Sequence, residues 1–391
     1  MYSRPNLSLR RVLEHIESYS LGSCEPPRSK QAPSNNNNNK SNRANNESPS
    51  QIRRNTKSRN LNKQRLFSIL KDKLIEDIKW CWMNATIPVI AAKSQTPFEF
   101  FRNFVNKNTP CIIEDLNVCG WTGNWDWKTV VERSGKGIVR INATPTGRGD
   151  AIIVDPSDKS RVFVAPEERM MEFSEFMNWL VFNREGPLSS RDVLYLSAQN
   201  DSLREEFIEL IESGFAPPSL EFGDEVFGKK CEASNLWIGD HRAVSTIHRD
   251  ITYENIYCVL RGKKVFHLLP PCCAPFLGEK PYPNAQYRKS SSNDEWIIQR
   301  NPGDTPWIEM DVAAEELEKS IAISPEFEMI VDLVQRVEIS TGQTLYLPAG
   351  WFHRVTQTEA TVAVNYWYDH DFNAAWALTE TIEEIVKSTS S

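Results

Sequence analysis

The sequence has no long apolar run, no leader-like beginning and no closely paired cysteines. None of its 391 residues lies in a stretch that approaches the roughly 18 consecutive apolar residues of a membrane-spanning helix. The first residues, MYSRPNLSLRR, lack the apolar segment of a secretory signal, so we expect a protein of the cytoplasm or the nucleus. The eight cysteines contain no C-x-x-C pair, which argues against a cysteine-based zinc site and favours reduced, mostly buried thiols.

What the chain does contain is enough apolar material for a large core. Apolar residues make up 40% of it and include 12 Trp and 18 Phe. Charge is distributed unevenly: residues 1–63 contain 12 basic and 4 acidic side chains, whereas the rest of the chain has a net charge of −15. An acidic body makes nucleic acid an unexpected partner, since phosphates attract basic surfaces.

Residues 1–63 are predicted to be a disordered, basic, asparagine-rich tail. Only four apolar side chains occur in residues 22–60, too few to offset the entropy lost on ordering. Three further parts follow in our interpretation: residues 64–230, with helices and strands that pack on a barrel, a β-barrel at 231–372, and a C-terminal helix at 373–391. Asn373 is the expected cap of that helix.

The predicted helices and strands of residues 64–230 alternate. Apolar residues at helical spacing predict a helix over 64–84, and a short helix is expected after Pro97. Strands are expected at 110–116, 137–146, 150–155, 161–165 and 193–199, and residues 166–172 are read as a turn. Helices are expected at 173–183 and at 201–213, where Gly214 ends the second one.

After residue 231 the sequence changes to short, closely spaced β segments. They are ASNLWIG, AVSTIHRD, NIYCVLRG, KKVFHLLPP, WIEMD, VQRVEIST, QTLYLPAGW, HRVTQT and TVAVNYWYD. Many short strands separated by turn residues predict a small barrel or a jelly roll. Within this region Arg261-Gly262-Lys263 is predicted to be a hairpin turn between two of the strands.

Two histidines and an aspartate in this region form a candidate metal site. His248 and Asp250 lie two residues apart at the end of a predicted strand, so their side chains leave from the same face. His353 follows about a hundred residues later in the same β region. Two imidazoles and one carboxylate leave open positions on one side of a metal, an arrangement that suits Fe(II) with a co-substrate and dioxygen. A His-x-Asp tripeptide alone is more often a surface ion pair or a histidine with satisfied hydrogen bonds, so the metal site is inferred from the surrounding sequence.

The surroundings resemble a known family. STIHRDITYENIYCVLRGKKVFHLLPP and TLYLPAGWFHRVTQTEATVAVNYWYD are similar to the jumonji-C branch of the cupin-fold 2-oxoglutarate oxygenases. The resemblance runs from about residue 64 to the C-terminus. It implies a mainly β fold, the double-stranded β-helix or jelly roll, with flanking helices. It also implies Fe(II) on His248, Asp250 and His353, with 2-oxoglutarate and dioxygen as co-substrates.

Further roles come from the same resemblance. Lys264 matches the lysine that pairs with the distal carboxylate of 2-oxoglutarate, and Tyr195 matches the tyrosine that binds the same carboxylate. The segment between Asp250 and Asn255 is one residue longer than the family leads us to expect. The other matching residues are Ser245, Asn255 and Asn365 near the iron and the co-substrate, and Tyr257 and Trp367 in the substrate pocket.

The implied activity is hydroxylation of a protein. ATPTGRGDAI, RVFVAPEERMMEFSEFMNWL and AVNYWYD resemble a family member that is a (3S)-lysyl hydroxylase and is also described as a peptidase. That resemblance implies a target lysine in a developmentally regulated, translation-associated GTP-binding protein, and pairing of C-terminal helices into a homodimer. Three alternatives stay open: a metal-dependent peptidase that cleaves histone tails, an asparaginyl or other protein hydroxylase, and a non-catalytic cupin that binds a partner.

Overall fold

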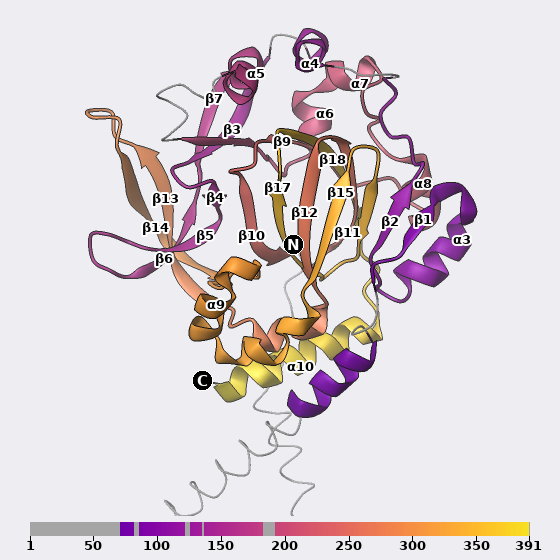
Figure 1. Cartoon of the computed structure of the whole chain (residues 1–391), viewed down its shortest axis with the longest axis vertical. Coiled ribbons are helices and arrows are strands. Elements are labelled where there is room, and N and C mark those ends of the chain that lie inside the picture. The colour runs from indigo at the N-terminus through magenta and orange to yellow at the C-terminus, as the bar shows by residue number, and fades with distance from the viewer. Residues whose placement is uncertain (1–70, 82–85, 122–125, 135–136, 183–191, 391) are drawn as a thin grey trace, which may run out of the picture. The chain divides into compact units, whose positions relative to one another are not determined.

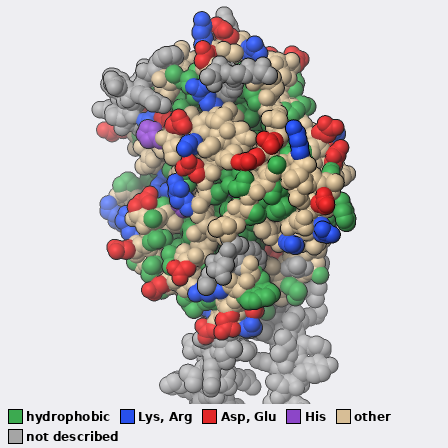
Figure 2. Space-filling view, turned by 45° about the vertical axis from the view of Figure 1, so that its right-hand side comes forward, with side chains coloured by type: hydrophobic (Ala, Val, Ile, Leu, Met, Phe, Trp, Pro, Cys, Tyr) green, Lys and Arg blue, Asp and Glu red, His purple; other side chains and the backbone are tan. Residues whose placement is uncertain are grey.

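The computed structural model describes residues 71–81, 86–121, 126–134, 137–182 and 192–390. They belong to one compact unit, Ser58–Ser391. The predicted tail at 1–63 lies outside the described residues, and the boundaries proposed near residues 63, 230 and 372 stay predictions. None of the described helices is long and apolar enough to cross a lipid bilayer. On the face seen in Figure 2, acidic and basic side chains are interspersed.

Eight strands form a double-stranded β-helix, which confirms the predicted fold class (Figure 1). One sheet contains the neighbours β16-β11-β18-β9 and the other contains β15-β12-β17-β10, so the chain crosses between the sheets at almost every connection. The strands are β9 (Ala233–Gly239), β10 (Val244–Arg249), β11 (Tyr253–Arg261), β12 (Lys263–Leu269), β15 (Gln335–Ser340), β16 (Thr344–Leu347), β17 (Phe352–Gln357) and β18 (Thr361–Asp369).

Strands from the N-terminal half extend both sheets. The larger sheet has nine strands in the order β1-β2-β16-β11-β18-β9-β8-β3-β7, and β4 (Arg148–Gly149) pairs in parallel with β10 on the smaller one. Residues 166–172, expected as a turn, contain β7 instead, which pairs with β3 along its whole length. The added strands are β1 (Val89–Ala91), β2 (Cys111–Glu114), β3 (Ile138–Thr144), β7 (Glu167–Glu172) and β8 (Val193–Leu196).

A third sheet lies beside the barrel (Figure 1); two of its strands, β5 and β6, were predicted, but the β13–β14 hairpin was missed. Its order is β14-β13-β6-β5, formed by β5 (Ala151–Val154), β6 (Arg161–Ala165), β13 (Lys280–Lys289) and β14 (Trp296–Trp307). The predicted strand WIEMD is wrong, because only Trp307 of it belongs to a strand. Prolines in β13 and β14 concealed the hairpin, since proline argues against a central strand; β14 is an edge strand, where proline is tolerated.

Helices flank the sheets. Residues 71–81 are helical, and α3 (Pro97–Phe100) continues as a π turn, Phe101–Val105. The helix predicted at 201–213 is broken at Phe207, which leaves the helical conformation and buries its ring against Phe173. The remaining helices are α4 (Trp127–Arg133), α5 (Phe173–Phe182), α6 (Ser202–Glu206), α7 (Ile208–Glu212), α8 (Glu221–Phe227), α9 (Leu317–Ile323) and α10 (Ala374–Ser390). Asn373 caps α10 as predicted, because its Oδ1 accepts a hydrogen bond from the Trp376 backbone N–H at 3.0 Å.

The central strands are buried on both faces, and the two faces serve different cores. On β11, Ile256 and Cys258 pack in the cluster that contains residues of α6 and α7, whereas Tyr257 and Val259 pack in the cluster between the two barrel sheets. Side chains alternate along a strand, so one sequence of nearly continuous apolar residues supplies both clusters. The inner cluster fills one part of the space between the sheets and leaves room for polar groups in the other.

The link at Arg261–Lys263 is not a hairpin turn, contrary to the prediction. β11 pairs with β16 and β18, whereas β12 pairs with β15 and β17, so this link passes from one sheet to the other. Gly262 makes the sharp change of direction possible because its φ of +80° lies in the left-handed region, which suits glycine. The link also places Lys264 at the start of β12.

We predict that Gly262→Ala lowers the free energy of unfolding by about 2 kcal/mol or more. A left-handed conformation costs an ordinary residue roughly 1–2 kcal/mol. The added Cβ would also lie 2.7 Å from the carbonyl oxygen of Ala360. Gly137→Ala is the control, since a Cβ there meets no atom within 4 Å. Urea unfolding of both variants measures the difference, and equal midpoints would contradict this role of Gly262.

Candidate metal centre

The structure brings His248, Asp250 and His353 together, as the sequence analysis expected. His248 on β10 and His353 on β17 are direct cross-strand neighbours, and their ring centroids are 4.2 Å apart. Asp250 follows the end of β10, and its Oδ2 lies 3.8 Å from Nε2 of His353. One potential ligand atom from each residue lies within 4.8 Å of the others. These distances suit a single metal ion bound from one side.

Hydrogen bonds fix which nitrogen of each imidazole is available. Nδ1 of His248 lies 2.7 Å from the carbonyl oxygen of Thr246, and Nδ1 of His353 lies 3.0 Å from that of Trp351. A carbonyl oxygen can only accept a hydrogen bond, so each Nδ1 carries the proton and each Nε2 keeps its lone pair. This is the arrangement in which a histidine binds a metal and its other nitrogen is held by the backbone.

A bulge in β10 turns a second polar side chain toward the same space. Ser245 pairs with Val355, and His248 pairs with His353. The two residues are three positions apart on β10, but their partners are only two positions apart on β17, so β10 contains one extra residue here. Val355 and His353 share a face of β17, and the extra residue therefore allows Ser245 and His248 to face the same side. Without the bulge, side chains three positions apart on a strand would point to opposite faces.

Arg249, between the two ligands of β10, points away from the centre as predicted. Its guanidinium lies 2.9 Å from both carboxylate oxygens of Glu383 on α10, and it stacks over the ring of Phe352 at 4.9 Å. Both charged side chains are nearly buried, with 8% and 6% of their surfaces exposed. On the other side, the Gly350 backbone N–H donates to the carbonyl oxygen of Asp250 at 2.9 Å. The strand end that carries Asp250 is thus held from two directions.

Burial keeps His353 uncharged. Removal from water and the charge of the neighbouring His248 together lower the pKa of His353 to about 4, although Asp250 and the hydrogen bond to the Trp351 carbonyl oxygen act in the opposite direction. A ligand nitrogen must be deprotonated to bind a metal, and this one is deprotonated throughout the physiological range. The site is therefore ready for a cation without a preceding proton release from His353.

Lys264 is buried beside the centre without an acidic partner. Only 1% of it is exposed, its Nζ donates to the hydroxyl of Tyr195 at 2.8 Å, and the rings of Tyr195, Trp237 and Tyr257 surround it within 6.0 Å. Burial lowers the pKa of Lys264 to about 7. No carboxylate of the described residues forms an ion pair with it. Such an ammonium has a strong preference for an incoming anion.

Close approach of Tyr195 depends on a glycine that the sequence analysis did not single out. Tyr195 on β8 pairs with Gly239 on β9, and a Cβ on Gly239 would lie 2.6 Å from the tyrosine ring. Glycine at this position thus allows the phenol to reach Lys264. Burial raises the pKa of Tyr195, so the hydroxyl stays protonated and able to donate a hydrogen bond.

The remaining predicted residues line the same space. Asn365 accepts from Nε1 of Trp237 at 2.8 Å and donates to Asn255 at 3.3 Å, and Trp367 stacks on Tyr253. The longer segment after Asp250 does not remove Asn255 from the pocket. The structure places Ser245, Asn255, Tyr257, Asn365 and Trp367 in one pocket with the three metal-binding candidates. Their individual roles stay predictions.

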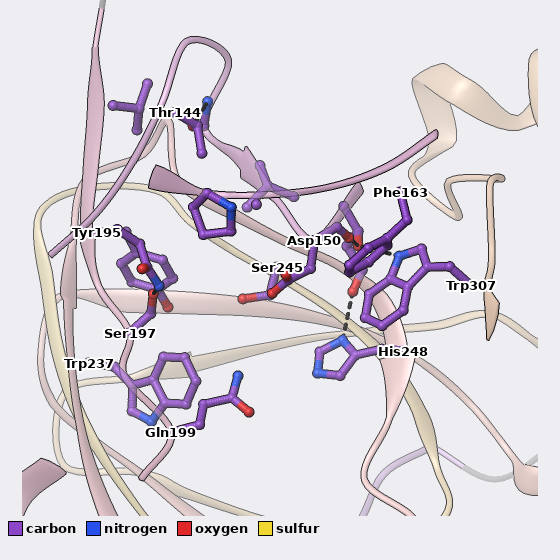
Figure 3. Close-up of a pocket in the computed structure, with 17 residues that line it drawn as sticks. Thr144, Asp150, Phe163, Tyr195, Ser197, Gln199, Trp237, Ser245, His248 and Trp307 are labelled. Atoms are coloured by element: carbon purple, nitrogen blue, oxygen red, sulfur yellow. Dashed lines mark hydrogen bonds between the residues drawn. The ribbon is translucent and has the colours of Figure 1, made fainter. Parts of the chain in front are cut away.

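A larger pocket, of about 300 Å³, opens outward from His248 and contains residues that the sequence analysis missed (Figure 3). Phe163 and Trp307 come from the third sheet, with ring centroids 4.9 Å apart, and Trp307 lies parallel to the imidazole of His248. Asp150 lies beside them, while Gln199 and Trp237 lie on the opposite wall. The motif ATPTGRGDAI contained Asp150, but nothing in the sequence indicated where its side chain would point.

The other histidines of the described chain lie elsewhere. His241 is exposed, His267 is half-buried on β12, and Nδ1 of His370 lies 2.6 Å from Glu254. Among the described residues, the group around His248 is the one place where three His, Cys, Asp or Glu side chains come close enough to share a metal ion.

The chain is similar in sequence to several known proteins. Residues 97–374 match the family described as "Cupin-like domain". "JmjC domain-containing protein E" of Dictyostelium discoideum is 33% identical, over 75% of this chain and 87% of its own. The human "Bifunctional peptidase and (3S)-lysyl hydroxylase JMJD7" is 31% identical over 76% and 89%, and "Lysine-specific demethylase JMJ32" of Arabidopsis thaliana is 30% identical over 76% and 86%.

We predict that His353→Ala weakens binding of a divalent ion by at least roughly 100-fold, more than is typical when only a supporting residue of a metal site is changed. The reason is that the variant loses one of three ligands. Titration of metal-free protein with Co²⁺, followed by its visible absorption, measures the affinity. His241→Ala, at an exposed histidine, should bind as the unchanged protein does. Equal affinity of the two variants would show that His353 is not a ligand.

Proposed function

Since the chain belongs to the cupin-like family that includes the JmjC proteins, we propose that it is an Fe(II)- and 2-oxoglutarate-dependent oxygenase that hydroxylates a lysyl residue of a protein. The observation that carries this proposal is a two-histidine, one-aspartate centre in a pocket that Tyr195 also lines, together with a buried ammonium, that of Lys264, which donates to the Tyr195 hydroxyl and has no acidic partner among the described residues. The three-residue centre fits a metal ion that keeps coordination positions open for other ligands, and the buried ammonium fits a carboxylate of 2-oxoglutarate.

The residues present fit both groups. Enzymes of the JmjC family use Fe(II) and 2-oxoglutarate, and the bound iron and 2-oxoglutarate would supply the activation of dioxygen. His248, Asp250 and His353 would hold the metal by two Nε2 atoms and a carboxylate. Lys264 and Tyr195 would bind the distal carboxylate of 2-oxoglutarate, with the Ser245 hydroxyl on the same wall. The protein thus provides position and charge.

The choice of lysine rests on the relatives. The names of the human and the Arabidopsis relative both refer to lysine, one as hydroxylase and one as demethylase. We propose C3 of a lysyl residue as the position that is hydroxylated. A translation-associated GTP-binding protein as substrate, and a homodimer formed through residues 373–391, are parts of the same proposal. Leu378 and Ile382 of α10 are exposed, which leaves an apolar surface for such a contact.

A direct assay tests the proposal. The full chain, loaded with Fe(II) and supplied with 2-oxoglutarate, ascorbate and a library of lysine-containing peptides, should release succinate and yield peptides that have gained one oxygen atom. Mass spectrometry with fragmentation locates that oxygen at C3. His248→Ala should lose both products, because it removes one of three ligands of the metal, whereas His241→Ala should keep them.

Other outcomes separate the rival functions. Shortened peptides without an added oxygen would favour the peptidase. Loss of a methyl group from methylated lysine would favour the demethylase. A chain that binds 2-oxoglutarate and metal but oxidises no peptide would support the non-catalytic cupin. Normal hydroxylation by His248→Ala would contradict the ligand assignment itself.

The state of Lys264 predicts how 2-oxoglutarate binding depends on pH. With a pKa of about 7, Lys264 is increasingly uncharged as the pH rises above 7, and a bound carboxylate would raise this pKa. The dissociation constant should therefore increase with pH above about 7, by up to roughly tenfold per unit, with uptake of a proton on binding. Calorimetry of the Mn²⁺-loaded protein, in buffers of different ionisation enthalpy, measures both effects.

Lys264→Arg provides the control, since arginine stays charged over this range. Its affinity for 2-oxoglutarate should not vary with pH, whatever its absolute value. His353 does not confuse the measurement because its pKa is about 4. The same pH dependence in both proteins would show that Lys264 is not the group that binds the dicarboxylate.

A further inference from the structure

Asp150 occupies an unusual position on the wall of the larger pocket that opens outward from His248, called the outer pocket below. Its φ is +52°, a left-handed conformation that few residues other than glycine adopt and in which aspartate and asparagine are the most frequent exceptions. It links β4 to β5, where the chain passes from beside β10 into the third sheet. Figure 3 shows Asp150 on the same side of the pocket as His248, next to Phe163 and Trp307.

Two hydrogen bonds connect Asp150 to the metal centre. The hydroxyl of Thr246 donates to the carbonyl oxygen of Asp150 at 2.6 Å, and the carbonyl oxygen of Thr246 accepts from Nδ1 of His248 at 2.7 Å. Nε1 of Trp307 donates to the same Thr246 hydroxyl at 3.2 Å. Asp150, His248 and Trp307 are therefore all positioned by one buried threonine. The hydrogen bond to its carbonyl oxygen fixes the backbone of Asp150 next to the metal centre.

The carboxylate of Asp150 forms no ion pair with a lysine or arginine among the described residues, and His248 is the one charged neighbour that favours its ionised form. Neighbouring Arg148 pairs with Asp311 at 2.9 Å instead. Among the described residues, Asp150 and Asp250 are the acidic side chains that line the pockets around His248, and His248 itself is the basic side chain on the wall of the outer pocket. In the described part of the chain, the outer pocket therefore presents one carboxyl group, that of Asp150, beside an aromatic wall and next to the metal centre.

We propose that Asp150 is the counter-ion for the ammonium of the substrate lysine, and that Phe163 and Trp307 pack along its methylene groups. This inference rests on the proposed function and specifies how that function selects its side chain. A carboxylate in a partly dehydrated pocket gains much from a cation that brings its own charge and hydrogen-bond donors. Aromatic rings beside the carboxylate provide apolar contact for the long stem of a lysine.

The length of the lysine side chain fits a site in which the metal centre and the Asp150 carboxylate are separate. Four bonds separate C3 of a lysyl side chain from its nitrogen, so a carboxylate set to one side of the metal can hold the ammonium while C3 stays at the centre. Burial raises the pKa of Asp150, which is the sign of a carboxylate that is poorly solvated before a partner arrives. A neutral side chain of the same length would leave that carboxylate without a partner.

Asp150→Asn tests the proposal with little risk to the fold, because asparagine accepts the left-handed conformation as readily as aspartate. The substrates are two nonapeptide libraries that differ only at the central position, one with lysine and one with its uncharged analogue norleucine. The unchanged protein should prefer the lysine library by roughly 10- to 100-fold in kcat/KM, and Asp150→Asn should lose this preference, in line with removal of one partner of a dehydrated ion pair. Affinity for 2-oxoglutarate should not change.

Asp115→Asn is the matched control. Asp115 is also a left-handed aspartate, with φ of +63°, but it is exposed on the surface. It should keep the full preference for lysine. An Asp150→Asn protein that still prefers lysine, or whose loss appears equally with norleucine peptides, would overturn the proposal.

A binding measurement separates failure of this inference from failure of the proposed function. Saturation-transfer NMR of the Zn²⁺-loaded protein with 2-oxoglutarate compares N-acetyl-lysine methylamide with its norleucine counterpart. Preference for the lysine compound that disappears in Asp150→Asn supports the counter-ion role, even if no peptide is oxidised and the oxygenase assignment fails. Equal binding of the two compounds by the unchanged protein would overturn the counter-ion role, even if lysine peptides are hydroxylated.

Discussion

The pairing of β10 with β17 is the interaction on which the site depends. Its register sets His248 opposite His353, and its bulge adds Ser245 to the same face. A slip by one residue would turn one imidazole toward the opposite face of the sheet and leave no centre. β12 pairs with the other edge of β17, with Lys264 opposite Gln357, so the position of the ammonium relative to the histidines is set by the same ladder.

The space between the sheets combines two conflicting requirements. One part is closed by packed apolar side chains such as Phe266, Leu268 and Leu345. The other contains Lys264, two asparagines and two imidazoles, whose burial costs free energy in the empty protein. The orientation of each group is nevertheless fixed by a neighbour: Tyr195 for Lys264, Trp237 for Asn365, and backbone carbonyls for the histidines. These buried polar groups therefore lower the free energy of unfolding of the ligand-free protein at the positions where ions are to be bound.

Much of this could be predicted from the sequence, and the failures have physical causes. The strands of the barrel were evident because alternating apolar residues and intervening turn residues are local signals, and the His-x-Asp spacing alone places two side chains on one face. Sheet membership is not local: nothing in Arg261-Gly262-Lys263 distinguishes a hairpin from a passage between two sheets. Proline in β13 and β14 concealed the hairpin: β14 is an edge strand, and Pro281 and Pro283 of β13 lie outside the segment 284–286 that pairs with β6. Trp307 and Asp150 were missed because only the third sheet and the β4–β5 link bring them to the pocket.

The ion pair between Arg249 and Glu383 has a consequence for how the protein can be handled. Glu383 comes from α10, the last element of the chain, while Arg249 stands between two candidate ligands. A shortened version that ends before α10 would leave the guanidinium of Arg249 without its carboxylate and without the helix that packs against it, so the strand end that carries Asp250 would lose one of its two anchors. A minimal fragment that keeps this ion pair therefore extends through α10, and fusion partners are better attached beyond the final helix than in place of it.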